Sequence, residues 1–186
     1  MVQVKERTFQ EVKAKYESLA TDLIKMEYLE STLRGPDSSI DIKNFAYSCL
    51  ATLYERRLMF DKAGKAMAMK AGYDTTFREK IETYLKAAEY YAKAQQLMIA
   101  EDMFVRASRE GNAEQQARVA LTRKNIYLSI AAELEKKGRM TNAAKFYEQL
   151  LSMKLDELEK SLIKKKLLEY YTKMGRFNDA KLVEKR

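Results

Sequence analysis

The stretch Ile126–Leu151, IYLSIAAELEKKGRMTNAAKFYEQLL, decides the fold of this chain. Apolar residues recur at helical spacing on both sides of Gly138-Arg139, namely Tyr127, Ile130, Ala131, Leu134, Met140, Ala143, Tyr147 and Leu150. This spacing predicts two helices joined by a short break, with Thr141-Asn142 as the polar start of the second helix. Because a lone helical hairpin cannot bury its apolar face, the stretch predicts stacked neighbours of the same kind.

Three other segments share this pattern when the chain is aligned on four reference residues: Phe60, Leu97, Met140 and Phe177. Three positions after each stands an alanine: Ala63, Ala100, Ala143 and Ala180. Nine positions before stand Ala51, Ala88, Ala131 and Leu168, and six before stand Tyr54, Tyr91, Leu134 and Tyr171. Thirteen before stand Tyr47, Tyr84 and Tyr127, with Lys164 breaking the set. Small residues let paired helices approach closely and large ones fill the space between hairpins, so the register predicts a repeat.

The composition favours an all-α protein. Only one Pro and six Gly occur in 186 residues, and 46 % of the residues are hydrophobic, enough to form a packed core. The turn signals predict about nine helices in two parts. Residues 1–36 form one long amphipathic helix, and residues 37–186 form four hairpins at about 40–72, 76–110, 113–153 and 156–186, called here blocks one to four.

The N-terminal helix carries a heptad-like stripe: Phe9, Val12, Tyr16, Leu19, Leu23, Met26 and Leu33, with Glu30 as its one break. Two interpretations fit this stripe. The helix either folds back on the next helix or forms a coiled coil with a partner chain. Gly35-Pro36-Asp37-Ser38 marks the boundary that ends it.

Blocks three and four carry the segments Lys137–Ala143 and Met174–Ala180, which resemble the turn of the tetratricopeptide repeat (TPR). The resemblance covers about residues 43–186 and implies a right-handed α-solenoid. The reference residues are 37, 43 and 37 positions apart, longer than the roughly 34-residue repeat of that family. The Pro that usually closes a repeat is absent, and blocks one and two lack the turn Gly, which indicates a divergent array. A plain helical bundle is the alternative.

In the TPR family the first helix of each hairpin lines a concave groove, and this implies a partner-binding function. The groove positions in this chain are Thr52, Glu55, Arg56, Glu89, Lys93, Asn125, Leu128, Lys136, Lys165, Glu169 and Lys173. Four of them stand four positions before the reference residues and form a basic rim: Arg56, Lys93, Lys136 and Lys173. The rim suits an acidic segment of another protein. Alternatively, these cations stabilise the C-terminal ends of the helices.

The residue inventory argues against an enzyme. The chain has no His, no Gly-rich phosphate loop and no GxGxxG motif, so His-dependent nucleophiles and His-based metal sites are excluded and no cofactor or metal is predicted. Carboxylate or Tyr acid–base chemistry stays open. Cys49 is the only cysteine and falls on an apolar helix face, which indicates a reduced thiol and a cytoplasmic protein. We expect no signal segment and no membrane span.

The net charge of +8 is concentrated near the C-terminus. Residues 112–186 carry 17 basic and 10 acidic residues, so an acidic partner would prefer that end. Basic clusters there also make a nucleic-acid-binding helical array the alternative function. A further hypothesis is self-association, either through the N-terminal helix or through an uncapped C-terminal repeat.

Overall fold

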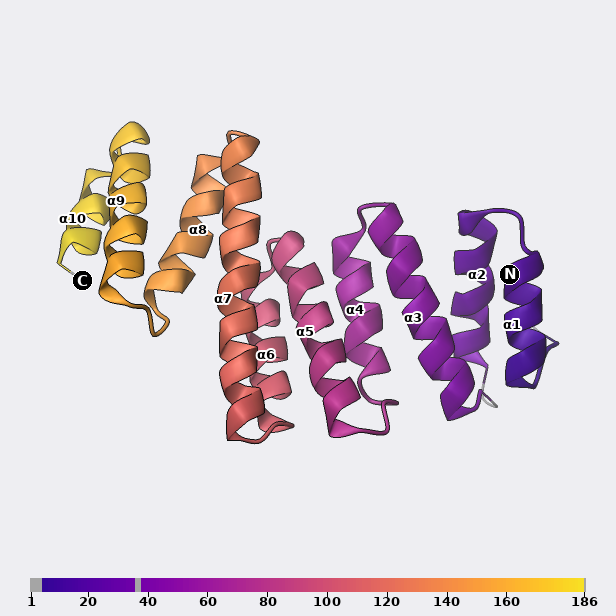
Figure 1. Ribbon diagram of the computed structural model, residues 1–186. Coiled ribbons are helices and arrows are strands. Elements are labelled where there is room, and N and C mark those ends of the chain that lie inside the picture. The colour runs from indigo at the N-terminus through magenta and orange to yellow at the C-terminus, as the bar shows by residue number, and fades with distance from the viewer. Residues whose placement is uncertain (1–4, 36–37, 186) are drawn as a thin grey trace. The chain divides into compact units, whose positions relative to one another are not determined.

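The computed structural model describes residues 5–35 and 38–185. Over these residues all regular secondary structure is helical and no strand occurs, which confirms the all-α prediction (Figure 1). The helices are α1 (Phe9–Ser18), α2 (Asp22–Arg34), α3 (Ile40–Arg56), α4 (Phe60–Lys70), α5 (Phe77–Lys93), α6 (Leu97–Arg109), α7 (Ala113–Lys136), α8 (Met140–Leu151), α9 (Glu157–Lys173) and α10 (Phe177–Glu184). The described part of the chain thus has ten helices, one more than expected.

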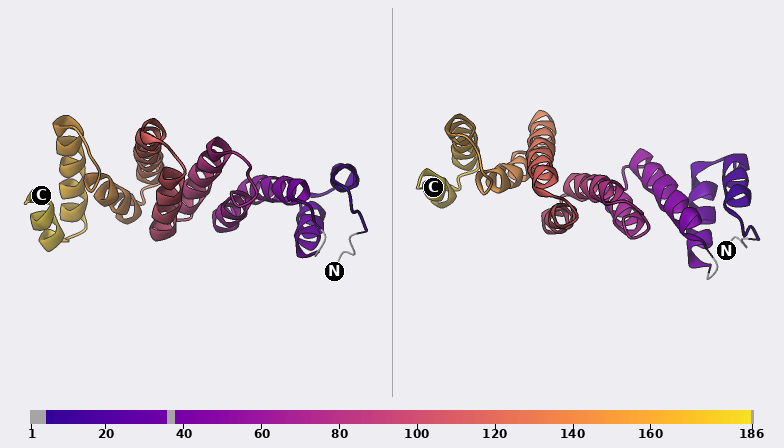
Figure 2. Two further views of the ribbon diagram at one scale, coloured as in Figure 1. Left: turned by 90° about the horizontal axis from the view of Figure 1, so that it is seen from below. Right: turned by 60° about the horizontal axis from the view of Figure 1, so that its bottom comes forward.

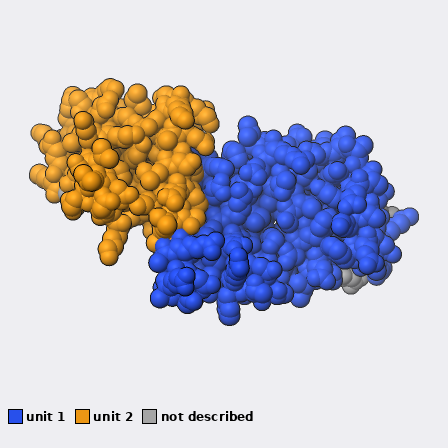
Figure 3. Space-filling model, viewed as in Figure 1, with its two compact units in different colours: residues 1–119 blue, residues 120–186 orange. Residues whose placement is uncertain are grey.

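The chain divides into two compact units, residues 1–119 and residues 120–186 (Figure 3). In unit 1 each helix from α2 to α5 packs on the helix that follows it in the chain. In unit 2, α8 packs on α9 and α9 on α10. The additional views of Figure 2 show the same pairs, such as α3 with α4 and α9 with α10, lying side by side.

The prediction of one long N-terminal helix is wrong. Helix α1 ends at Ser18, whose hydroxyl donates a hydrogen bond to the carbonyl of Lys15 at 2.7 Å. Leu19 is extended, and the Thr21 side chain caps α2 by accepting a hydrogen bond from the amide of Ile24. The apolar stripe hid this cap, because a stripe can continue in register across a local break. One consequence is that Leu23, a member of the stripe, is 61 % exposed.

The first helix folds back within unit 1. Phe9 and Tyr16 of α1 both pack edge-on against Phe45 of α3, with ring centroids 5.5 Å apart. Fully buried Val12 joins them in a core that extends to α5. Of the boundary predicted between this segment and block one, Pro36 and Asp37 lie outside the described residues, while Ser39 caps α3.

The four reference residues are each the first residue of a second helix: Phe60 of α4, Leu97 of α6, Met140 of α8 and Phe177 of α10. The residue before each one adopts nearly the same backbone conformation, with φ between −88° and −90° and ψ between 59° and 66°. The residue two before each one is left-handed: Leu58, Gln95, Gly138 and Gly175 have φ of 57°, 63°, 69° and 70°. One turn conformation therefore occurs four times.

The same hydrogen bond closes each turn. The amide that precedes the reference residue donates to the carbonyl five residues earlier, in the pairs Met59–Tyr54, Gln96–Tyr91, Arg139–Leu134 and Arg176–Tyr171, at 2.8–2.9 Å. This bond satisfies a carbonyl near the end of the first helix and fixes where the second helix begins. Glycine suits the left-handed position in blocks three and four, while blocks one and two place Leu58 and Gln95 there at a conformational cost.

The alanine register produces close packing. Ala63, Ala100 and Ala143 are completely buried, as are Ala88 and Ala131 on the first helices. Lys164, the exception in the tyrosine column, is half-buried, as Tyr47 and Tyr84 are, whereas Tyr127 is fully buried. Cys49 is half-buried, and burial raises the pKa of its thiol.

Local capping sets the remaining helix starts. Thr76 and Glu79 form a capping box at α5, as Asp156 and Glu159 do at α9. Asn112 exchanges two hydrogen bonds of 2.9 Å with Gln115 at the start of α7. The long spacing between blocks two and three is taken up by α7, which has 24 residues where α3, α5 and α9 have 17 each.

Candidate partner-binding surfaces

The basic rim predicted from the sequence lies at the ends of the first helices. Arg56, Lys93, Lys136 and Lys173 are the last residues of α3, α5, α7 and α9. A cation at this place is favoured by the helix dipole, by about 0.3–1 kcal/mol. Three of the four also form ion pairs: Arg56 with Asp22 at 3.8 Å, Lys93 with Glu89 at 2.6 Å and Lys173 with Glu169 at 2.6 Å. The rim therefore contributes to structure as well as surface charge.

In unit 1 the structure brings predicted groove residues together between α3 and α5. Glu55 accepts a hydrogen bond of 2.6 Å from the hydroxyl of Tyr90, and Lys86 lies 4.0 Å from it. Glu89 pairs with Lys86 at 3.0 Å and with Lys93 at 2.6 Å. Burial would raise the pKa of Glu89, but hydrogen bonds from Lys93 and Lys86 outweigh it and lower that pKa. Glu55 thus joins α3 to α5, whereas Glu89 pairs with lysines of its own helix α5.

Unit 2 repeats this arrangement in the same register. Glu135 of α7, five positions before its reference residue as Glu55 is, accepts hydrogen bonds from Tyr170 and, at 2.8 Å, from Lys166. The hydroxyl of Tyr147 on α8 donates to the same carboxylate at 2.8 Å. Burial would raise the pKa of Glu135, but these three hydrogen bonds together hold it below its usual range. Burial and the adjacent Glu135 raise the pKa of Tyr170.

A Glu–Lys–Tyr bridge therefore links first helices in each unit: Glu55–Lys86–Tyr90 and Glu135–Lys166–Tyr170. Sequence reasoning placed Glu55 in an open groove and missed the role of Lys86 and Lys166. The sequence did contain a sign of this bridge. A lysine stands eleven positions, and a tyrosine seven positions, before both Leu97 and Phe177.

The other predicted groove positions differ in exposure. Thr52 on α3 is exposed, as are Asn125, Lys136 and Lys165 in unit 2. Leu128 is half-buried. These exposed side chains are the predicted groove residues best placed to meet a partner.

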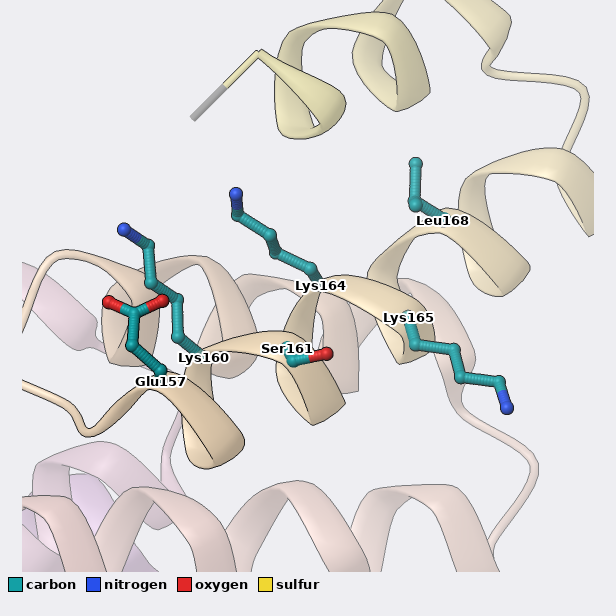
Figure 4. Close-up of a pocket in the computed structure, with 6 residues that line it drawn as sticks. All are labelled: Glu157, Lys160, Ser161, Lys164, Lys165 and Leu168. Atoms are coloured by element: carbon teal, nitrogen blue, oxygen red, sulfur yellow. The ribbon is translucent and has the colours of Figure 1, made fainter.

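A hollow of about 400 Å³ lies on α9 (Figure 4). It is lined by Glu157, Lys160, Ser161, Lys164, Lys165 and Leu168. Figure 4 shows Lys160 and Lys164 rising from the same side of the helix as Leu168, whereas Lys165 points away from them. Three lysines against one glutamate give this hollow a positive charge, and of its residues only Lys165 was among the predicted site residues. The sequence feature that could have pointed to this hollow was Lys164, which interrupts the column of tyrosines at that position.

A second hollow, of about 420 Å³, lies in unit 1 where α2, α3 and α4 meet. Its wall is mostly apolar and aromatic, formed by Leu33, Tyr47, Leu50, Tyr54, Ala66 and Met69. Arg34, Lys62 and Lys65 stand at this hollow with one acidic residue, Glu30. The Glu30 carboxylate accepts a hydrogen bond from Tyr54, which explains why a glutamate interrupts the apolar stripe of α2.

Comparisons of the chain with protein-family models, with curated proteins and with solved structures find no match. Within residues 5–35 and 38–185, no cluster of three or more Cys, Asp or Glu side chains is arranged to hold a metal ion. No helix in that described part combines the length and apolar character that crossing a bilayer requires.

Proposed function

We propose that this protein is a non-enzymatic, TPR-like adaptor of the cytoplasm whose hairpins stack as a right-handed α-solenoid. The first helices of the hairpins bind an acidic peptide or helix of another protein. The observation that carries this proposal is the fourfold turn, which repeats one backbone conformation at Phe60, Leu97, Met140 and Phe177. Repeated hairpins of one register stack into extended surfaces that recognise other chains.

The bridges between first helices support this proposal. Glu55 with Tyr90, and Glu135 with Tyr170, hold neighbouring first helices together through hydrogen bonds to charged groups. A surface held in place before binding loses less conformational entropy when a partner arrives. Thr52, Asn125 and Lys165 are exposed on these helices and can touch a partner without breaking either bridge.

Site-specific cross-linking tests the proposal. A photo-reactive residue is placed at Thr52, at Asn125 or at Lys165, and at exposed Lys145 on the second helix α8 as the matched control. We expect one protein to be captured from the native source by the first-helix variants and not by the control. Its acidic segment, made as a peptide, should then bind the purified full chain and be displaced by the unlabelled segment. Equal capture at Lys145, or failure of the purified peptide to bind, would overturn the proposal.

A salt titration separates this function from nucleic-acid binding. An array that grips phosphates loses affinity steeply with salt, about 10³–10⁵-fold between 50 and 200 mM for six to ten contacts. Several basic residues of unit 2 are already paired with carboxylates, among them Lys124, Lys166 and Lys173. We therefore expect mixed-sequence RNA to bind far more weakly than the acidic peptide at 50 mM salt.

A further inference from the structure

One position recurs in three hairpins with the same kind of neighbour. It stands sixteen residues before the reference residue and holds Asn44, Ile81 and Lys124 in blocks one to three. Asn44 donates hydrogen bonds to the carbonyl of Tyr73 at 3.5 Å and to Asp74 at 3.3 Å. Lys124 pairs with Glu159 at 2.6 Å.

Block two shows the same contact without a charge. A Cβ built on Gly111 would lie 3.3 Å from the Cδ1 atom of Ile81, so the turn after α6 passes directly over this position. In all three hairpins, then, the start of the next hairpin covers the first helix at this position. In two of the three, the covering group is a carboxylate.

Both carboxylates lie at the start of a helix. Asp74 stands two residues before Thr76, the N-cap of α5, and Glu159 is the third residue of α9. Around Asp74 the neighbouring positions also take part. Tyr47 stacks on Tyr73 with ring centroids 5.8 Å apart, and the Lys43 ammonium lies 5.3 Å from the centre of that same ring. In block one the first helix therefore contacts both an aromatic ring and a carboxylate of the turn that follows.

Block four places Lys160, Ser161 and Lys164 at the positions of Lys43, Asn44 and Tyr47. These three residues line the hollow on α9, and within the described part of the chain no following hairpin covers them (Figure 4). None of their side chains forms a hydrogen bond or ion pair with another described residue. The hollow is more basic than its counterpart in block one, because Lys164 replaces Tyr47 and Lys165 stands beside it.

We propose that the hollow on α9 binds the acidic first turn of a helix from another protein, which takes the place that Asp74 and Glu159 take on the preceding hairpins. This inference rests on the proposed adaptor function and identifies one contact and its chemistry. The occupant places a carboxylate between Lys160 and Lys164 and an apolar or aromatic side chain against Leu168. The charge of the hollow, three lysines against Glu157, favours that carboxylate over a basic or neutral segment.

The probe is a synthetic peptide of residues 71–82, AGYDTTFREKIE, the segment that covers the equivalent face of block one. It is titrated into the isotope-labelled full chain and followed by amide chemical shifts. We expect shifts over residues 157–168, and about tenfold weaker binding of the same peptide carrying Asp74→Asn, as for the loss of one charge-assisted hydrogen bond. Absence of shifts over 157–168 at millimolar peptide overturns the inference, as does equal binding of the Asp74→Asn peptide.

Variants of the full chain provide the second arm. Lys164→Glu should abolish these shifts and Lys164→Gln should weaken them, while Lys145→Glu on α8 should leave them unchanged. Circular dichroism of each variant verifies the fold, and Lys164→Gln keeps the test valid if the charge reversal unfolds the last hairpin. Equal loss with Lys145→Glu would mean that the peptide responds only to net charge, and would overturn the inference.

Other occupants give distinct results. If a second copy of the chain fills the hollow, sedimentation will show a mass that grows with concentration and returns to the monomer in Lys164→Glu. If an RNA strand fills it, oligouridylate will shift residues 157–168 with a steep salt dependence while the peptide does not. Either result overturns the inference. Partner capture at Thr52 that survives Lys164→Glu would leave the adaptor function standing while the α9 contact fails.

Discussion

The fourfold turn predicts that glycine is favoured at each left-handed position, so removing Gly138 should destabilise the protein and placing a glycine at position 58 should stabilise it. Gly138 has φ of +69° and open space within 4 Å of where a Cβ would stand, so Gly138→Ala should meet no clash and only backbone strain. A left-handed non-glycine residue costs about 1–2 kcal/mol. The smaller freedom of alanine in the unfolded chain offsets about 0.4–1 kcal/mol of that cost. Gly138→Ala should therefore lower the free energy of unfolding by about 0.5–1 kcal/mol.

The same estimate applies with the opposite sign in block one. Leu58 holds the equivalent left-handed position with φ of 57°, and its side chain is 74 % exposed, so Leu58→Gly removes strain and little packing. It should raise the free energy of unfolding by about 0.5–1 kcal/mol, a two- to fivefold change in the folding equilibrium. Replacing an exposed leucine by glycine normally destabilises a helical protein. An increase in stability for Leu58→Gly would therefore point specifically to strain at the left-handed position.

The assay is urea unfolding of the full chain by far-UV circular dichroism, combined with amide hydrogen exchange. Exchange reads α3–α4 and α7–α8 separately, which matters because Leu58 and Gly138 lie in different units. Gly72→Ala is the control, since Gly72 is not left-handed and its Cβ would make an ordinary 3.4 Å contact with the Met69 carbonyl. The reasoning is refuted if Gly138→Ala behaves like Gly72→Ala, or if Leu58→Gly destabilises its hairpin.

Three further predictions concern the interior. Ala143 is completely buried, so Ala143→Leu should lower the free energy of unfolding by about 1–3 kcal/mol through overpacking. Ala180 is half-buried, so Ala180→Leu should lower it by less than half as much. Equal shifts in melting temperature for the two variants would contradict this. The folded pKa of Glu135 lies below its ordinary value of 4.5, so the stability that this group contributes is present above pH 4.5 and is lost as the pH falls through the folded pKa. In urea titrations between pH 3 and 7, the free energy of unfolding of Glu135→Gln should therefore fall less steeply with decreasing pH than that of the original protein. An unchanged fall would argue against the bridge. Gly64→Ala puts a Cβ 3.0 Å from the Tyr91 ring, so the gain of about 1 kcal/mol in the free energy of unfolding that this change usually brings inside a helix should be missing. The gain should return when Tyr91 is also replaced by leucine. Additive effects of the two substitutions in a double-mutant cycle would exclude this contact.

Local chemistry made much of the architecture predictable. The positions of Phe60, Leu97, Met140 and Phe177 marked four helix starts because capping, turn closure and small-residue spacing act within a few residues of each other. The Thr76–Glu79 capping box is local in the same sense, since its two residues are three positions apart. The break between α1 and α2 is local too, but the apolar stripe runs across it and hid the C-cap at Leu19 and the N-cap at Thr21.

The contacts between hairpins were decided by tertiary structure alone. Glu55 meets Tyr90 across 35 positions, and Glu135 meets Tyr170 across the same distance in sequence. Helical periodicity sorts residues into apolar and polar faces, but it cannot distinguish a polar residue that faces solvent from one that bonds to the next hairpin. The sequence determined which helices form and where they turn, since those choices are made within one or two helical turns. Which charged side chains hold neighbouring hairpins together, and which, like Lys160 and Lys164, have no ion-pair partner among the described residues, depended on packing between residues far apart in the chain.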